Sequence, residues 1–113
     1  MAVFCIEELQ YLLNNSAAKA IVYHATFAPI LSEVLDDLDG VELLVQVADD
    51  SGNALLEGAV DYEELLASAS GDRPDVELSP DDLYILYTGG TTGMPKGVLW
   101  RQHDIFISAM GGR

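Results

Sequence analysis

The chain has 113 residues, half of them hydrophobic, and its 19 acidic and five basic side chains give a formal net charge of −14 at pH 7. Interspersed apolar and charged residues over this length predict one globular domain at most and exclude a disordered chain. The acidic balance argues against binding to nucleic acid or to an anionic membrane surface, and no apolar run approaches the roughly 18 residues of a membrane span.

The single cysteine, Cys5, cannot form a disulfide within the chain. This usage favours a reducing cytoplasm, and the first nine residues lack the basic region that precedes the apolar part of a signal peptide. We expect Cys5 to be a small buried hydrophobic residue and not a nucleophile.

The first 47 residues alternate between helical and strand-like patterns. Apolar residues at helical spacing predict a short helix over about residues 5–15 and a clearer one over residues 27–38, which Gly40 ends. The apolar run at residues 20–24 predicts a buried strand, and residues 41–47 predict the next one.

The next segments are more polar. Residues 49–58 predict an exposed, turn-rich loop, and Asp61 with Glu64 has the spacing of a capping box at the start of a short helix. Residues 70–80 contain a glycine, two prolines and several charges, which predicts an exposed linker. Residues 83–87 are all apolar and predict a strand that is buried on both faces.

A second strand is expected around residues 97–101, followed by a helix with Asp104 as its N-cap. This order, in which helices and strands alternate, predicts an α/β fold with a mostly parallel sheet flanked by helices on both faces. Ligands of such sheets bind beyond the carboxyl ends of the strands, which is where the segment after residue 87 falls.

That segment, residues 88–97, reads TGGTTGMPKG and contains four glycines and three threonines. Such a composition predicts a loop whose backbone N–H groups can turn toward an anion, and the hydroxyls and a lysine add further donors. We interpret it as a phosphate-binding loop. The candidate binding residues are Thr88, Gly89, Gly90, Thr91, Thr92, Gly93 and Lys96.

Charge placement supports the interpretation of a phosphate-binding loop. The first 95 residues carry 18 of the 19 acidic side chains and two of the five basic ones, and no carboxylate lies between Asp82 and Asp104. A gap of this kind in an acidic chain suits a polyphosphate, which a nearby carboxylate would repel.

The rival interpretation is a plain hairpin loop between two strands, with Lys96 solvated. Two other phosphate-binding patterns do not fit. A Walker loop needs Gly-Lys-Ser/Thr, whereas Lys96 follows Pro95 and precedes Gly97, and a G-x-G-x-x-G pattern fails because position 88 is Thr.

The remaining polar and aromatic candidates are given structural interpretations. His24 and His103 are expected to be satisfied or solvent-facing side chains, and Tyr84 and Trp100 to be packing residues. Neighbouring acidic residues point apart on a helix or strand, so we expect solvated faces and assign no metal site. No catalytic residue is assigned in this chain.

The string from Tyr87 to Val98, YTGGTTGMPKGV, resembles the signature loop of the AMP-forming adenylating enzymes, the AMP-dependent synthetases and ligases. The usual form of that loop is Tyr/Phe-Thr-Ser-Gly-Thr-Thr-Gly-x-Pro-Lys-Gly-Val. The chain departs from it at Gly89, where Ser is usual, which removes a hydroxyl donor and leaves a backbone N–H. The Gly variant followed by Val-Leu-Trp-Arg-Gln looks most like a bacterial acyl-CoA synthetase, a fatty-acid–CoA ligase.

The resemblance implies that residues 1–113 are part of the N-terminal AMP-binding domain of such an enzyme. The intact enzyme would use ATP, with Mg²⁺, to activate a carboxylic acid, fatty or otherwise acyl, as an acyl-adenylate and would pass the acyl group to coenzyme A. The loop backbone, the threonine hydroxyls and Lys96 would hold the β- and γ-phosphates during that reaction.

Enzymes of this family are several times longer than 113 residues. The resemblance therefore implies an internal fragment or a truncated reading frame that depends on the rest of the enzyme and has no ligase activity alone. Two alternatives stay open: an inert remnant, and a small stand-alone module that binds phosphate or a nucleotide.

Overall fold

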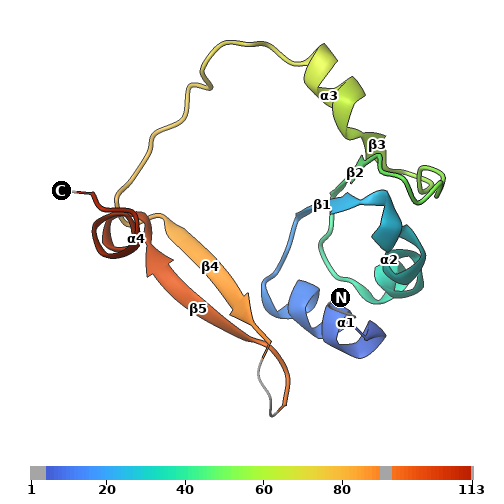
Figure 1. The fold of residues 1–113 in the computed structure, drawn as a ribbon, viewed down its shortest axis with the longest axis horizontal. Coiled ribbons are helices and arrows are strands. Elements are labelled where there is room, and N and C mark those ends of the chain that lie inside the picture. The colour runs from blue at the N-terminus through green and yellow to red at the C-terminus, as the bar shows by residue number, and fades with distance from the viewer. Residues whose placement is uncertain (1–4, 90–92, 113) are drawn as a thin grey trace. The chain divides into compact units, whose positions relative to one another are not determined.

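A computed structural model describes residues 5–89 and 93–112 and divides the chain into two compact units, residues 1–71 and 72–113 (Figure 1). The first unit contains all of the parallel sheet, and the second contains a hairpin followed by a helix. No helix in the described part of the chain is long and apolar enough to cross a bilayer.

The first unit is an α/β arrangement around a three-stranded sheet of order β1-β2-β3, in which both strand pairs are parallel. This confirms the predicted fold class. The five-residue register of β1 with β2 pairs Ala20 with Leu43 and His24 with Val47. The elements are α1 (Ile6–Asn15), β1 (Ala20–His24), the 3₁₀ turn η1 (Ala25–Phe27), α2 (Ala28–Val34), the 3₁₀ turn η2 (Leu35–Asp37), β2 (Leu43–Val47), β3 (Val60–Asp61) and α3 (Tyr62–Ser68).

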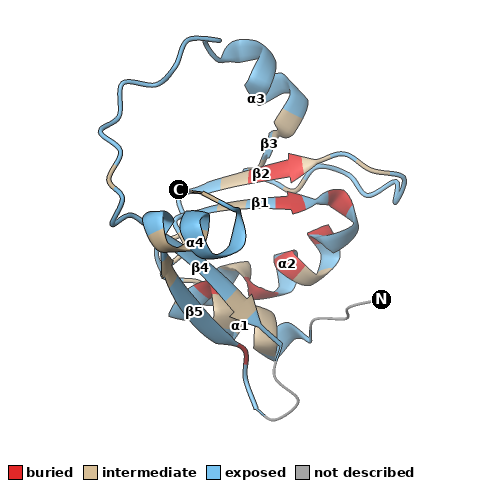
Figure 2. Ribbon diagram, turned by 60° about the vertical axis from the view of Figure 1, so that its left-hand side comes forward, coloured by how far each residue is buried: buried red, intermediate tan, exposed pale blue. Residues whose placement is uncertain are grey.

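The core of this unit is formed by α1, β1 and α2, whose buried residues appear red in Figure 2. Val34 on α2 is fully buried, and the apolar spacing that predicted this helix also selects its buried face. The cluster of buried side chains consists of Leu13, Tyr23, Ala28, Leu31 and Val34.

Local sequence signals account for several of the element ends. Pro29 lies in the first turn of α2, where its missing N–H costs little, and Gly40 has a φ of +88° after the helical segment ends. The predicted cap of α3 is confirmed, because the Asp61 carboxylate accepts a hydrogen bond of 3.1 Å from the backbone N–H of Glu64.

Gln46 on β2 is buried, and its side chain ties the polar loop that follows back to the sheet. Its Oε1 accepts hydrogen bonds from the Tyr23 hydroxyl at 2.8 Å and the Leu56 backbone N–H at 3.2 Å, and its Nε2 donates to the Ala54 carbonyl at 3.1 Å. Burial raises the pKa of the Tyr23 hydroxyl, so this group stays a protonated donor.

The second unit consists of β4 (Leu83–Thr88), β5 (Lys96–Arg101) and α4 (Gln102–Ala109). The two strands form an antiparallel hairpin with six paired residues on each side. Residues 88–97 therefore connect two paired strands, as the interpretation of this segment as a hairpin loop expects. The prediction that β4 is buried on both faces is wrong for this chain, because Leu83, Ile85 and Leu86 are 54%, 41% and 49% exposed.

Two smaller predictions are also wrong. Helix α4 begins at Gln102 after Arg101, so Asp104 lies in its first turn instead of at its N-cap. Cys5 is the N-cap residue of α1 and is exposed, so it is not the buried hydrophobic residue that was expected.

Candidate functional site

The predicted phosphate loop joins β4 to β5. Thr88 is the last residue of β4, Gly89 follows it, and Lys96 is the first residue of β5, so the strands position both ends of the loop. Of the predicted site residues, Gly90, Thr91 and Thr92 lie outside the described residues, and the roles expected of them remain predictions.

The base of the loop is closed by a cross-strand pair. Thr88 faces Lys96 in the hairpin register, and the Thr88 hydroxyl donates a long hydrogen bond of 3.5 Å to the Lys96 carbonyl. This contact places the start of the lysine side chain directly opposite the threonine.

The described residues at the two ends of the loop are exposed to solvent. Thr88, Gly89, Gly93 and Lys96 are exposed, and apart from its chain neighbours no described residue has an atom within 4 Å of the position that a Cβ would occupy at either glycine. Gly93 has a φ of +86°, a conformation that favours glycine. Pro95, in contrast, is buried and anchors the end of the loop. An anion can therefore approach the backbone from outside.

Positive charge on the hairpin is divided between two basic residues with different surroundings. Arg101 is engaged: its Nη1 lies 3.1 Å from Asp81, and its Nε lies 2.8 Å from Asp104. The hydrogen bonds and charge of Arg101 lower the pKa of Asp104, and those of Asp104 raise the pKa of Arg101. Lys96 is exposed, and no ion pair among the described residues involves it.

Gly97 is part of the site in a way that the sequence analysis missed. It faces Tyr87 across the hairpin, and a Cβ at this glycine would lie 3.1 Å from the Tyr87 ring and 3.2 Å from the Ile85 Cγ2. Glycine therefore lets the ring lie close to the strand that carries Lys96. The glycine was visible in the sequence, but its neighbour across the hairpin was not.

Other polar candidates organise turns. The Asp49 carboxylate accepts hydrogen bonds from the backbone N–H groups of Ser51 at 2.9 Å and Thr26 at 2.8 Å, and lies 3.8 Å from His24. Hydrogen bonds with Ser51 are the main reason that the pKa of Asp49 is lowered. Within the described part, no three His, Cys, Asp or Glu side chains gather into a metal-binding group.

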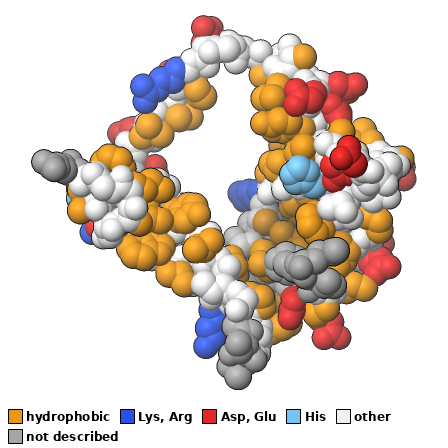
Figure 3. All heavy atoms as spheres, viewed as in Figure 1, with side chains coloured by type: hydrophobic (Ala, Val, Ile, Leu, Met, Phe, Trp, Pro, Cys, Tyr) orange, Lys and Arg blue, Asp and Glu red, His pale blue; other side chains and the backbone are white. Residues whose placement is uncertain are grey.

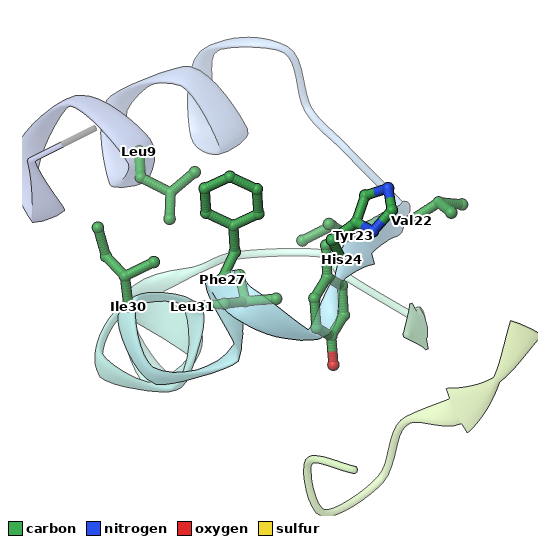
Figure 4. Close-up of a pocket in the computed structure, with 8 residues that line it drawn as sticks. Leu9, Val22, Tyr23, His24, Phe27, Ile30 and Leu31 are labelled. Carbon is green, nitrogen blue, oxygen red and sulfur yellow. The ribbon is translucent and has the colours of Figure 1, made fainter. Parts of the chain in front are cut away.

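The first unit also has an apolar surface pocket of about 270 Å³ beside β1 (Figure 4). Phe27 and Leu9 face each other across it in the close-up, and His24 lies at the end of the strand. Its lining carries few polar groups, so the pocket offers no anchor for a phosphate. The lining residues are Leu9, Ile21, Val22, Tyr23, His24, Phe27, Ile30 and Leu31.

Several solved structures share the fold of this chain. The anthranilate CoA ligase AuaEII, solved in complex with anthranoyl-AMP, matches 96% of this chain with a TM-score of 0.81 at 22% identity, over 20% of its own length. The acyl-CoA synthetase of Brucella canis matches 88% of this chain with a TM-score of 0.67 at 25% identity, over 17% of its own length. The chain thus has the fold of one segment of such ligases.

The sequence profile of the family described as "AMP-binding enzyme" matches residues 4–112, and the chain belongs to that family. It is 63% identical over 106 residues to the medium-chain acyl-CoA ligase Mig of Mycobacterium avium, covering 94% of this chain. It is 42% identical over 110 residues to a medium/long-chain-fatty-acid–CoA/3-oxocholest-4-en-26-oate–CoA ligase of Mycobacterium marinum. The chain spans 19% and 20% of the length of these two relatives. The predicted family is confirmed.

Proposed function

We propose that this chain supplies the phosphate-binding loop of an ATP-dependent acid–thiol ligase that forms acyl-CoA. The observation that carries the proposal is the Gly/Thr string that ends in Lys96, whose described candidates, Thr88, Gly89, Gly93 and Lys96, are exposed. The chain that carries it matches the AMP-binding enzyme family over residues 4–112. The names of the relatives support a medium- or long-chain fatty acid as the substrate.

In the proposed reaction the substrate carboxylate attacks the α-phosphorus of ATP. The bond from that phosphorus to the bridging oxygen breaks, and pyrophosphate leaves with the electron pair. The thiol of coenzyme A then attacks the acyl carbon, and AMP departs. Negative charge accumulates on the leaving pyrophosphate, so fixed donors around the β- and γ-phosphates stabilise the transition state.

The loop has the donors that this charge requires. Gly89 and Gly93 bring backbone close to solvent without covering side chains, and Lys96 adds a full positive charge. Thr91, Thr92 and the backbone of Gly90 are proposed to complete the cradle. Magnesium would supply charge neutralisation on the phosphate oxygens, its preferred type of ligand.

The hairpin is proposed to depend on further polypeptide for a stable environment. Apolar side chains line β4 and β5 in Figure 3, and those of Tyr84, Leu86 and Leu99 are 42%, 49% and 64% exposed. Two-stranded hairpins are marginally stable alone in water. We therefore expect this chain by itself to lack ligase activity.

The single cysteine and the use of ATP and coenzyme A support a cytoplasmic location.

A graft tests the proposal. Residues 4–112 replace the matching segment of the M. avium ligase, and ATP–pyrophosphate exchange is measured with a medium-chain fatty acid. Loss of one charge-assisted contact of about 1.5–3 kcal/mol predicts that Lys96→Ala lowers kcat/KM for ATP about tenfold to a hundredfold.

Lys19→Ala is the matched control, because it removes an exposed lysine that precedes β1 and lies outside the loop. It should leave exchange unchanged. If the grafted enzyme is active and Lys96→Ala exchanges pyrophosphate at the parent rate, the phosphate role of the loop is refuted.

A further inference from the structure

The apolar pattern of the hairpin does not select its register. One face of the β4–β5 pair carries Leu83, Ile85 and Leu99, and the other carries Tyr84, Leu86 and Val98, and all six are exposed. A slip of one residue moves every side chain of a strand to the opposite face. Here both faces are apolar, so such a slip leaves the same amount of apolar surface in much the same environment.

Side-chain contacts at the open end of the hairpin distinguish the registers. The guanidinium of Arg101 uses Nε and Nη2 on the two oxygens of Asp104, at 2.8 and 3.0 Å, and Nη1 on Asp81 at 3.1 Å. Asp81 precedes β4, so its contact with Arg101 joins the two strands at the open end of the hairpin. Asp104 lies three residues after Arg101 and holds the guanidinium in place. Lysine, with a single ammonium, cannot reproduce this fork.

Backbone hydrogen bonds support the same register. The N–H of Gln102 donates to the Asp82 carbonyl at 2.8 Å, and the N–H of His103 donates to the Pro80 carbonyl at 3.1 Å. Both bonds join residues just before β4 to residues just after β5, at the end of the hairpin where Arg101 lies. Together with the contact between Arg101 and Asp81 they form a clamp that a slipped hairpin loses, whereas the local pair of Arg101 and Asp104 is kept.

The clamp has a consequence at the other end of the hairpin. The pair Leu83–Arg101 and the pair Thr88–Lys96 belong to one continuous register. A slip would lengthen or shorten the loop and change the distance between the Gly89 backbone and the ammonium of Lys96. It would also move Gly97 away from the Tyr87 ring that its missing side chain accommodates.

We propose that Arg101 is a positioning residue for the loop: by clamping Asp81 and Asp104 it holds β4 and β5 in the register that sets the span between Gly89 and Lys96. The value of that span for nucleotide binding rests on the proposed function. The effect on register does not, so the two are tested separately.

Disulfide trapping in the 113-residue chain measures the register. In a Cys5→Ser background, the pair Leu86→Cys with Val98→Cys lies directly opposite and should form a disulfide. The pair Leu86→Cys with Leu99→Cys lies on opposite faces in the native register and becomes cross-linked only after a slip of one residue.

Adding Arg101→Gln should raise the yield of the slipped disulfide about two- to fivefold, the population change expected from an exposed ion pair. Asp81→Asn removes the charge of the residue that Arg101 contacts across the hairpin but leaves an amide oxygen that can accept a hydrogen bond, so it should give a smaller rise in the same direction. Arg73→Gln, in the linker, is the matched control and should give none. A yield unchanged by both Arg101→Gln and Asp81→Asn would overturn the proposal.

The grafted ligase provides the second measurement. With the loop misplaced but its donors intact, Arg101→Gln should raise KM for ATP about two- to fivefold with little change in kcat, and Arg101→Lys should not restore it. A shifted register with an unchanged KM would refute the link from Arg101 to the loop. If Lys96→Ala has no effect in the graft, the proposed function fails, while the trapping result still decides the role of Arg101.

Discussion

Replacing Gln46 by Met tests how the first unit is held together. Met has nearly the length of Gln and is apolar, so the substitution leaves little cavity and removes three hydrogen bonds. The Tyr23 hydroxyl loses its acceptor in the core, where Tyr23 is only 8% exposed. Near the surface, water can replace the partners of the Ala54 carbonyl and the Leu56 N–H.

The expected loss follows from these contacts. An unpaired buried hydroxyl costs about 1–3 kcal/mol, and each of the two outer hydrogen bonds contributes roughly 0.5–1 kcal/mol. We therefore expect Gln46→Met to lower the free energy of unfolding of the first unit by about 2–5 kcal/mol. Tyr23→Phe should cost less, because the Gln46 Oε1 still accepts from Leu56.

Urea unfolding followed by far-ultraviolet circular dichroism measures the loss, and hydrogen exchange of the β1 and β2 amides assigns it to this unit. The double variant Tyr23→Phe/Gln46→Met removes both partners and should cost about 1 kcal/mol less than the sum of the single variants. Strictly additive losses, or a loss below about 0.5 kcal/mol for Gln46→Met, would refute the reasoning that this network is buried and coupled.

Three further outcomes are expected. Asp61→Ala removes the N-terminal cap of α3 and should cost about 1 kcal/mol in urea unfolding, while Asp61→Asn should cost less. The pKa of Asp49 is lowered, chiefly by hydrogen bonds with Ser51, so its stabilisation is present above the ordinary pKa and is lost as pH falls through the lowered one. The difference in urea midpoint between wild type and Asp49→Asn should thus be constant above about pH 5 and shrink below about pH 4. In the grafted ligase, Gly93→Ala forces a φ of +86° on alanine, which costs roughly 1–2 kcal/mol and should raise KM for ATP. Gly89→Ser places its side chain in open space and should change KM for ATP by less than about twofold.

The elements that the sequence predicted well are those whose signals are local. Strand β1 has the predicted bounds, residues 20–24, because the residues that follow Lys19, AIVYH, form one short and mostly apolar run. Helix α1 and the capped start of α3 at Asp61 follow from spacing within one or two turns. Strand β3 was not predicted, because its two residues, Val60 and Asp61, are too short to show a period.

The loop was recognised from residues 87–98 alone, because its glycines, threonines and lysine are consecutive in the chain. The burial of the strand that leads into the loop could not be predicted in the same way. The prediction that β4 is buried assumed that an apolar run is always covered. Among the described residues β4 pairs with β5 alone, and apolar side chains on both faces are exposed. Burial depends on what lies against a strand, and a strand's own residues do not contain that information.

By itself, the sequence determined the family and the order of the elements other than β3, since each is encoded by neighbouring residues, and it predicted a phosphate-binding loop at residues 88–97. Only the tertiary structure showed that Arg101 links Asp81 to Asp104 and that Gln46 bonds Tyr23 across 23 positions of sequence. It alone showed that Gly97 makes room for the ring of Tyr87. The physical reason is that hydrogen bonds and steric fit act over a few ångströms in space, between residues that strand pairing and packing bring together from distant parts of the chain.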